Sequence, residues 1–320
     1  MTASDVRPRT APVVVGPVTA AVRWIFVANL VAQIAIVVTG GVVRLTGSGL
    51  GCPTWPACVE GSYVPTNRPE VGWHEYIEFG NRTLTFVLGL LALAAIAGVA
   101  VDARRRRRAG LPARPALIAL ACAPLLGSVA QAVLGGIVVL TGLHPTLVAM
   151  HLLVSMVIVA ACAVLVQRAG EPGDRPVVVV VVPAVRWLVR ATVVVAAVVV
   201  VLGTAVTGSG PHSGDDAAEH RFSFDPRTVA WLHADLVLLL VGLTIGVLVA
   251  AYALGGPAPL RRRAWLLAAA LLANGAIGYT QYFTGLPWAL VACHLLGASL
   301  VWLCVVRLTL ATRTRGVRSA

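Results

Sequence analysis

The sequence predicts an all-α integral membrane protein, with eight transmembrane helices forming two tandem pseudo-symmetric four-helix bundles and both termini cytoplasmic. Three observations predict this class: the apolar composition, the long charge-free windows and an internal repeat. Of the 320 residues, 58% are hydrophobic and 12% are charged, and the mean hydropathy is +0.87. Soluble domains carry about 25% charged residues. The composition therefore excludes an ordinary soluble enzyme, a disordered chain and a disulfide-rich miniprotein.

Charge-free windows place the spans, because a membrane helix needs about 20 apolar residues. Four windows hold one helix each: 24–43, 83–101, 191–214 and 236–260. Two longer windows, 115–167 and 264–306, are broken by TGLHP and TGLP, so each holds two helices joined by a tight turn. We expect the apolar run 177–182 to lie at the cytoplasmic interface, because Arg186 and Arg190 follow it.

The arginines set the orientation, and every one of the 25 basic residues is an arginine. With the N-terminus inside, the inner segments hold Arg7, Arg9, Arg23, Arg104 to Arg108, Arg114, Arg168, Arg175, Arg186, Arg190, Arg261 to Arg263, Arg307, Arg313, Arg315 and Arg318. The outer segments hold Arg44, Arg68, Arg82, Arg221 and Arg227. This asymmetry follows the positive-inside rule. The charge of +12 therefore indicates a multi-pass plasma-membrane protein and no nucleic-acid partner.

The chain repeats itself at an offset of 143 residues. Segments 141–153 (TGLHPTLVAMHLL) and 284–296 (TGLPWALVACHLL) share nine of 13 positions, and TGSG occurs at both 46–49 and 207–210. A repeat of this length predicts two copies of one helical unit. We therefore divide the chain into an N-terminal bundle, 1–170, and a C-terminal bundle, 171–320.

The repeat makes His151 and His294 equivalent, each roughly 10 Å inside the outer surface at 1.5 Å per helical residue. His233 begins the sixth helix, and Asn81 takes the matching place in the second. Two imidazoles at one depth in a helical bundle are typical axial ligands of a haem iron. Interhelical hydrogen bonding is one alternative. Zinc is another, although no further cysteine or carboxylate converges on His233 and His294.

Two further pairs carry chemistry at the outer ends of the helices. Glu78 and Arg82 share one helical face at i and i+4. They form either an interfacial ion pair or a functional group, with Glu78 handling protons or positioning substrate and Arg82 holding a haem propionate. Cys52 and Cys58 lie in the first outer loop, where an oxidising exterior favours a disulfide. Such a bond is either a structural clip or a redox-active pair.

With these motifs, the sequence resembles the haem A synthase family. The matching segments are GGVVRLTGSGLGCPTWPACVEG (40–61), EFGNRTLT (78–85), TGSGPHSGD (207–215), and those around His151, His233 and His294. The resemblance implies a membrane enzyme that oxidises the C8 methyl of haem O to the formyl of haem A by successive hydroxylation, in support of cytochrome oxidase assembly.

The resemblance also assigns groups to residues. It places haem b on His233 and His294 and the substrate haem O on His151, with Glu78 at an important acidic position and Cys52 and Cys58 at the loop cysteine pair. Its implied partners are a haem O synthase, which supplies the substrate, and the lipid bilayer. The electron donor is unknown, and a homo-oligomer is among the partners considered.

One residue departs from the family pattern Glu-x-x-His-Arg, because Asn81 stands in the histidine position of EFGNR. Two interpretations follow. The substrate iron is five-coordinate on His151, with a position left open for oxygen chemistry near Asn81, or His74 approaches as a second ligand. We favour the first, because an oxidation needs access to the metal.

Two other functions compete with this prediction. A bis-histidine membrane cytochrome b that passes electrons from quinol would share His233 and His294 but would not need Glu78, Arg82 and His151. A transporter built from duplicated bundles would bind no haem, and its histidines would relay protons.

Overall fold

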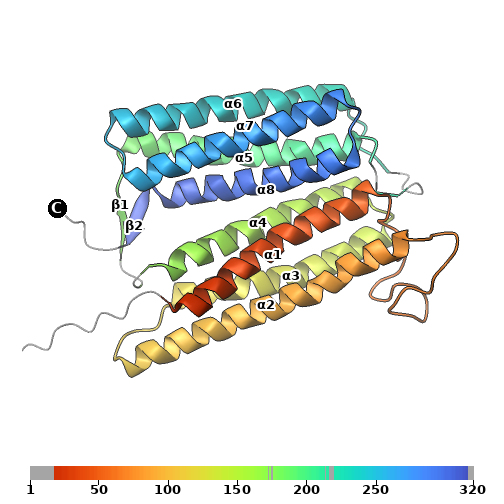
Figure 1. Ribbon diagram of the computed structural model, residues 1–320, viewed down its shortest axis with the longest axis horizontal. Coiled ribbons are helices and arrows are strands. Elements are labelled where there is room, and N and C mark those ends of the chain that lie inside the picture. Colours follow the sequence, from red (N-terminus) through yellow and green to blue (C-terminus); the bar gives the residue numbers. More distant parts are fainter. Residues whose placement is uncertain (1–17, 172, 174–175, 213, 216–219, 316–320) are drawn as a thin grey trace, which may run out of the picture.

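The computed structural model describes residues 18–171, 173, 176–212, 214–215 and 220–315. Four of the arginines used to predict the orientation lie outside these residues: Arg7, Arg9, Arg175 and Arg318. Within the described part the chain forms eight long helices and one pair of short strands (Figure 1). The helices are α1 (Ala20–Leu45), α2 (His74–Arg108), α3 (Pro115–Leu140), α4 (Pro145–Ala169), α5 (Pro183–Ser209), α6 (Pro226–Ala253), α7 (Ala258–Phe283) and α8 (Trp288–Leu310).

The tight turns predicted inside the two long windows are confirmed, and they share one backbone conformation. Gly142 and Leu143 adopt φ of 63° and 61°, and Gly285 and Leu286 adopt 78° and 59°. A leucine rarely takes positive φ, because its Cβ crowds the backbone there. The same unusual pair in both turns agrees with the sequence repeat.

Seven of the eight described helices are long and apolar enough to cross a membrane, and α7 is the exception. The first two turns of α7 contain Arg261 to Arg263, and its second half contains polar residues. These are Asn274, Tyr279, Thr280, Gln281 and Tyr282. The structure thus supports an all-helical integral membrane protein, in which α7 is the one described long helix without an apolar stretch of that length.

Two elements differ from the prediction. The run at 177–182 contributes a short strand, β1 (Val177–Val179), which pairs antiparallel with β2 (Arg313–Arg315) beyond α8. Its β-branched valines favour a strand, and Pro183 starts α5 directly afterwards. Helix α2 is longer than its apolar window and runs through the arginines to Arg108. Arginine has a high helix propensity and interacts favourably with a helix C-terminus.

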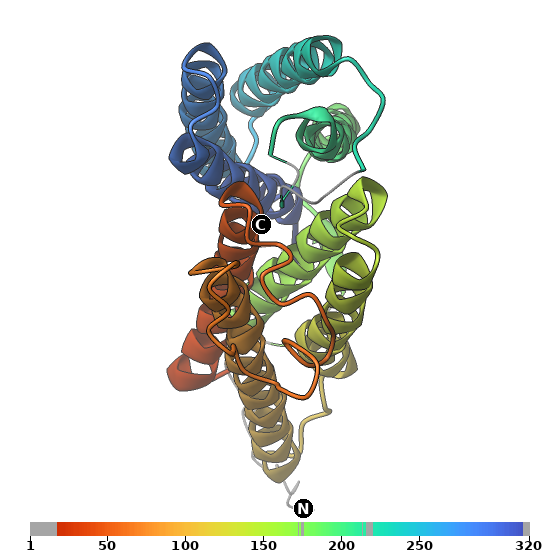
Figure 2. The same ribbon diagram turned by 90° about the vertical axis from the view of Figure 1, so that its right-hand side faces the viewer.

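The helices pack in two groups of the same cyclic order. In the first group α1 contacts α2 and α4, and α3 contacts α2 and α4; in the second, α5 contacts α6 and α8, and α7 contacts α6 and α8. Helix α8 joins the groups by contacting α1 and α4, and α4 also contacts α5 (Figure 2). At this junction the Trp302 indole donates a hydrogen bond of 2.8 Å to the Met156 carbonyl.

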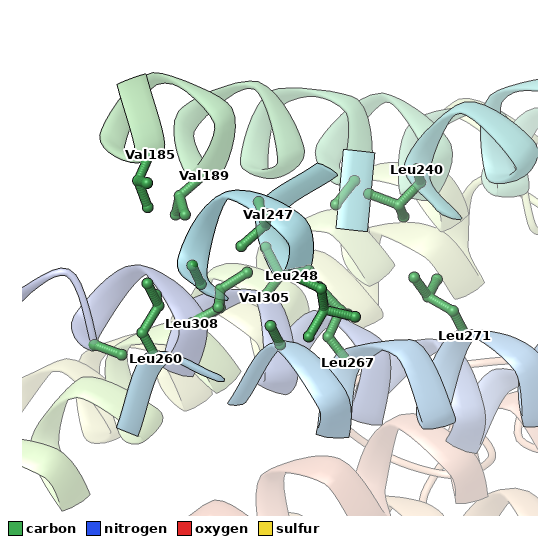
Figure 3. Close-up of a cluster of buried hydrophobic side chains, with 14 of the residues drawn as sticks. Val185, Val189, Leu240, Val247, Leu248, Leu260, Leu267, Leu271, Val305 and Leu308 are labelled. Atoms are coloured by element: carbon green, nitrogen blue, oxygen red, sulfur yellow. The ribbon is translucent and has the colours of Figure 1, made fainter. Parts of the chain in front are cut away.

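Each group buries its largest apolar cluster toward the same end. In the second group the cluster lies at the start of α5 and α7 and toward the end of α6 and α8 (Figure 3), and its labelled members include Val185, Leu248, Leu260 and Leu308. The first group packs Phe26, Val99, Leu117 and Leu165 in corresponding places. The histidines on α4, α6 and α8 lie near the helix starts, and therefore toward the opposite end.

Candidate functional site

Each of the four helix pairs sets a glycine of its first helix against a polar side chain of its second. A Cβ on that glycine would contact the side chain at 3.0 to 3.9 Å. The pairs are Gly40 with Asn81, Gly135 with His151, Gly203 with His233, and Gly278 with His294. In the three histidine pairs the nearest ring atom is Cε1. The absent side chain on each glycine therefore makes the room that the ring or amide occupies.

The C-terminal group carries one imidazole near the start of each of two helices. His233 lies in the third turn of α6 and His294 in the second turn of α8, and each ring faces a glycine of the preceding helix. Both rings are half-buried, and Nδ1 of His233 is enclosed without a hydrogen bond of normal geometry among the described residues. Paired imidazoles in an apolar bundle are a donor set that suits haem iron. The residues present therefore fit a haem with two histidine ligands.

The N-terminal group offers one imidazole and one amide instead. His151 on α4 faces Gly135, and its Nδ1 is likewise buried without a hydrogen bond in the described structure. Asn81 on α2 faces Gly40, and its Oδ1 accepts a hydrogen bond of 2.8 Å from the Thr39 hydroxyl. Asn81 therefore occupies in this group the position that His233 occupies in the other.

His74, the alternative second ligand, is engaged elsewhere. Its Nδ1 hydrogen-bonds Ser48 Oγ at 2.9 Å, and its ring stacks on Trp73 with centroids 4.1 Å apart. No contact between His74 and Asn81 occurs among the described residues. The structure therefore ties His74 to the start of the first outer loop.

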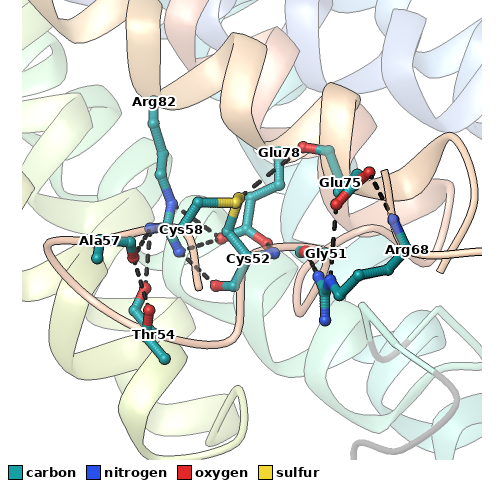
Figure 4. Close-up of polar contacts among 9 residues, drawn as sticks. All are labelled: Gly51, Cys52, Thr54, Ala57, Cys58, Arg68, Glu75, Glu78 and Arg82. Atoms are coloured by element: carbon teal, nitrogen blue, oxygen red, sulfur yellow. Dashed lines mark hydrogen bonds and ion pairs between the residues drawn. A yellow bond between two sulfur atoms is a disulfide. The ribbon is translucent and has the colours of Figure 1, made fainter. Parts of the chain in front are cut away.

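The loop between α1 and α2 is closed by a disulfide between Cys52 and Cys58, as predicted, and it is fastened to α2 by Glu78 (Figure 4). One carboxylate oxygen accepts the Cys52 backbone N–H at 2.6 Å. The other accepts from the Arg82 guanidinium, also at 2.6 Å. Glu78 is buried, and both of its carboxylate oxygens accept hydrogen bonds in these contacts.

Arg82 completes this clamp. Its guanidinium donates to the carbonyl oxygens of Cys52, Thr54 and Ala57, at 2.6, 2.9 and 3.1 Å. Together with the two contacts to Glu78, all five of its N–H groups have acceptors. The donors that we expected to meet a propionate are therefore used within the protein, where they fix the loop.

A second buried ion pair lies beside the first. Glu75 is fully buried; one of its oxygens lies 3.6 Å from Arg68 Nε, and the other accepts the Arg68 backbone N–H at 3.2 Å. Arg68 also donates to the Gly51 carbonyl next to the disulfide. The sequence analysis missed this pair, although Glu75 precedes Glu78 by three residues and so shares its helical face.

The same loop reaches the His151 side of the bundle. The Trp55 ring packs against Gly136 on α3, where a Cβ would overlap it. The neighbouring residue, Gly135, is the one that faces His151. Through Trp55, the disulfide loop therefore contacts the residue next to Gly135, the glycine that makes room for the His151 imidazole.

Comparison with known proteins agrees with this arrangement. Residues 22–306 match the family model described as cytochrome oxidase assembly protein. The chain belongs to the haem A synthase family. This membership confirms the resemblance that the sequence motifs indicated, and the match spans helices α2 to α7 completely and most of α1 and α8.

Similar members of the haem A synthase family come from several bacteria. A protein named heme A synthase from Lysinibacillus sphaericus is 32% identical over 145 residues, which is 45% of this chain and 43% of that protein. One of the same name from Geobacillus thermodenitrificans is 33% identical over 109 residues, 34% of this chain and 30% of that protein. The aligned stretch thus covers less than half of each relative.

Sequence reasoning found the polar residues of this candidate haem A synthase site but missed the small ones. Gly135 and Gly278 align in the repeat, yet only packing shows that they face His151 and His294. Gly40 and Gly203 fall outside the aligned repeat. A glycine in the last two turns of the helix that precedes each polar residue is the signal that could have identified them.

Proposed function

We propose that the protein is a haem A synthase, an oxidoreductase that converts the C8 methyl of haem O to the formyl of haem A by successive hydroxylation. The observation that carries the proposal is the asymmetry between the two groups: paired histidines in one, and a histidine opposite an asparagine in the other. A permanent redox cofactor suits the first arrangement, and a substrate that must react suits the second.

In the C-terminal half, 171–320, His233 and His294 would hold haem b through its iron. The glycine facing each ring and the buried Nδ1 of His233, which has no hydrogen bond of normal geometry in the described structure, support this assignment. Haem b supplies one-electron transfer when bound. The histidines orient it, and the apolar cluster at the other end of the group keeps their helices in register.

In the N-terminal half, 1–170, His151 binds the iron of the substrate haem O. Asn81 cannot replace a second imidazole, because a neutral carboxamide is a weak iron ligand. The position opposite His151 therefore stays accessible for oxygen chemistry. Thr39 holds the Asn81 carboxamide at this position through the 2.8 Å hydrogen bond.

Glu78 and Arg82 act together on the outer loop. They hold the Cys52–Cys58 loop against α2, and Trp55 extends the same loop to α3 beside the His151 site, which limits access of water from outside. We retain Glu78 as the proton-handling acid, because it lies one helical turn from Asn81 on α2. Arg82 keeps that carboxylate in place.

The membrane arrangement completes the proposal. All eight helices cross the plasma membrane, with both termini cytoplasmic and the disulfide loop outside. The two halves are pseudo-symmetric bundles, a haem O synthase supplies the substrate, and the product serves the terminal oxidase. The shared turn conformation and cyclic helix order support the duplication.

A bis-histidine cytochrome b is the second candidate, favoured by the His233 and His294 pair alone. It gives no role to His151 or to the clamp that fastens the loop beside it.

The test is extraction and mass analysis of the haems from protein produced alongside a haem O source. We expect haem b together with hydroxylated or formylated farnesyl haem from the wild type. His151→Ala should keep haem b and lose the farnesyl haems. Haem b alone in the wild type, with substrate supplied, would favour the cytochrome, and a colourless protein would favour a transporter.

A further inference from the structure

Asn274 is a polar residue on α7 that lies directly against His294 on α8. In the carboxamide orientation that satisfies its neighbours, Nδ2 donates to the His294 carbonyl at 3.1 Å and to His294 Nδ1 at 3.3 Å. Oδ1 then accepts the Ala298 backbone N–H at 3.3 Å. Nδ1 of His151 and of His233 has no such partner in the described structure.

Two glycines make this contact tight. A Cβ on Gly297 of α8 would overlap the Asn274 carboxamide, so α7 approaches α8 closely at this level. Gly278 lies one turn further along α7, where a Cβ would stand 3.0 Å from the His294 ring. Asn274 and Gly278 therefore share one helical face and bound the same imidazole.

The equivalent residue in the other half makes a different contact. The repeat offset of 143 pairs Asn274 with Gln131 on α3, Gly297 with Val154, and Ala298 with Ser155. Gln131 Nε2 donates to the His151 carbonyl at 2.8 Å and to the Ser155 hydroxyl. The longer amide thus stops at the backbone and the Ser155 hydroxyl, and it leaves the His151 ring without a hydrogen bond.

We propose that Asn274 is a positioning residue for His294, which supplies the hydrogen bond at Nδ1 and so fixes the orientation and basicity of this ligand. The inference rests on the proposed function, because it assumes that His294 binds haem b. A metal-bound imidazole usually donates its second N–H to a nearby acceptor, which orients the ring and raises its basicity.

A carboxamide can serve this role in either protonation state of the ring, because one end donates and the other accepts. Without haem, Nδ2 faces an unprotonated Nδ1, as in the orientation described. When Nε2 binds iron, the neutral ring carries its proton on Nδ1, and a half-turn of the amide presents Oδ1 to that N–H. The same turn sets Oδ1 against the His294 carbonyl and Nδ2 against the Ala298 N–H, so the hydrogen bond to the ring must offset these two contacts.

The experiment compares the haem b midpoint potential and its low-spin electron paramagnetic resonance spectrum in full-length wild type and variants. Asn274→Leu keeps the approximate volume and removes both polar ends. A less basic ligand stabilises the ferric state less, so the midpoint potential should rise. Haem b affinity should fall by about 10- to 100-fold, because the hydrogen-bond partner of a metal-bound imidazole is lost. Asn274→Asp, a stronger acceptor, should shift the potential in the opposite direction.

Two controls separate positioning from general damage. Gln131→Leu removes the equivalent amide in the other half and should leave the haem b potential unchanged. Gly297→Ala displaces the Asn274 carboxamide without removing it and should raise the potential as Asn274→Leu does. If Asn274→Leu fails to fold, Asn274→Asp and Gly297→Ala carry the test through their opposite shifts.

An unchanged potential and spectrum in haem-loaded Asn274→Leu, or shifts of the same sign for Leu and Asp, would overturn the inference. A wild-type protein without a bis-histidine haem would instead refute the proposed function.

Discussion

The two halves of the molecule share one framework and differ at the positions where a haem would meet the protein. Both place their apolar clusters away from the histidines, and both join their last two helices by a Gly-Leu turn with positive φ. The second helix of each half carries a different residue: His233 in one and Asn81 in the other. In the proposed function, this single difference would leave one half with two histidine ligands for haem iron and the other half with one.

The halves also secure the start of that second helix differently. Helix α6 has a capping residue, Asp225, which accepts from the Thr228 backbone N–H at 2.8 Å. Helix α2 follows Trp73, which provides no side-chain cap, and its first turns are held by the Glu75 and Glu78 ion pairs. In the N-terminal half, the polar contacts at the start of the second helix thus also hold the Cys52–Cys58 loop, which lies beside the candidate site.

The largest effect should come from removing the ligands of one half at a time. His233→Ala and His294→Ala should each abolish the low-spin bis-histidine spectrum, because the two imidazoles act as a pair. His151→Ala should leave that spectrum intact and lose the substrate haem. Visible spectroscopy of purified protein measures both haems. Equal loss of both haems in all three variants would contradict the assignment of haem b to one half and of the substrate haem to the other.

The next effect comes from making the halves alike. Asn81→His should supply a second imidazole opposite His151, so the substrate haem becomes six-coordinate and turnover falls by an order of magnitude or more, because the reactive position is filled. Asn81→Ala should retain substrate-haem binding. Spin-state spectroscopy with haem O present checks this, and binding lost in Asn81→Ala as severely as in His151→Ala would refute the open-site interpretation.

Breaking the clamp should damage the N-terminal half selectively. Glu78→Ala leaves the Cys52 N–H and two N–H groups of Arg82 without an acceptor, and removing one partner of a buried ion pair costs about 3–5 kcal/mol. Thermal unfolding and hydrogen exchange of residues 50–58 should report the loosened loop. Glu78→Gln keeps the hydrogen-bond geometry but cannot ionise, so full turnover in a folded Glu78→Gln would remove its role as the proton-handling acid.

A graded series should follow from the glycines that face the polar side chains. An added Cβ would stand 3.0 Å from the ring at Gly278, 3.2 Å at Gly135 and 3.4 Å at Gly203, and 3.9 Å from the amide at Gly40. Alanine at Gly278 should therefore reduce haem b retention most, and alanine at Gly40 should be tolerated, because replacing a helical glycine itself gains about 1 kcal/mol. Haem content per protein measures the series, and a reversed order would contradict the packing argument.

The smallest effect concerns the cap of α6. Hydrogen bonds from the Thr228 hydroxyl and backbone N–H hold the pKa of Asp225 below its ordinary value. The stabilisation is therefore fully present above the ordinary carboxyl pKa, about 3.9, and is lost as the pH falls through the lower folded value. Asp225→Asn should retain the cap and remove this acid dependence, as measured by hydrogen exchange at the start of α6. An unaltered acid dependence would assign it to another group.

Particular elements show how far the sequence alone could lead. It predicted the helices joined by TGLHP and TGLP, the equivalence of His151 and His294, the family and the disulfide. It did not predict β1, because Val177–Val179 form a strand only when Arg313–Arg315, beyond α8, pair with them. It also predicted a propionate contact for Arg82, because the loop carbonyls that accept from its guanidinium lie 25 to 30 residues earlier in the chain.

Hydrophobicity and repetition are properties of the chain itself, and they determined that this protein is a helical membrane protein whose sequence repeats around His151 and His294. Tertiary structure alone decided which glycine faces which imidazole, that Glu78 and Arg82 hold the loop, and that Asn274 reaches the His294 ring where Gln131 reaches only the His151 backbone and Ser155. The reason is physical: these contacts depend on how closely two helices approach, and that distance is set by the small residues on both helices together.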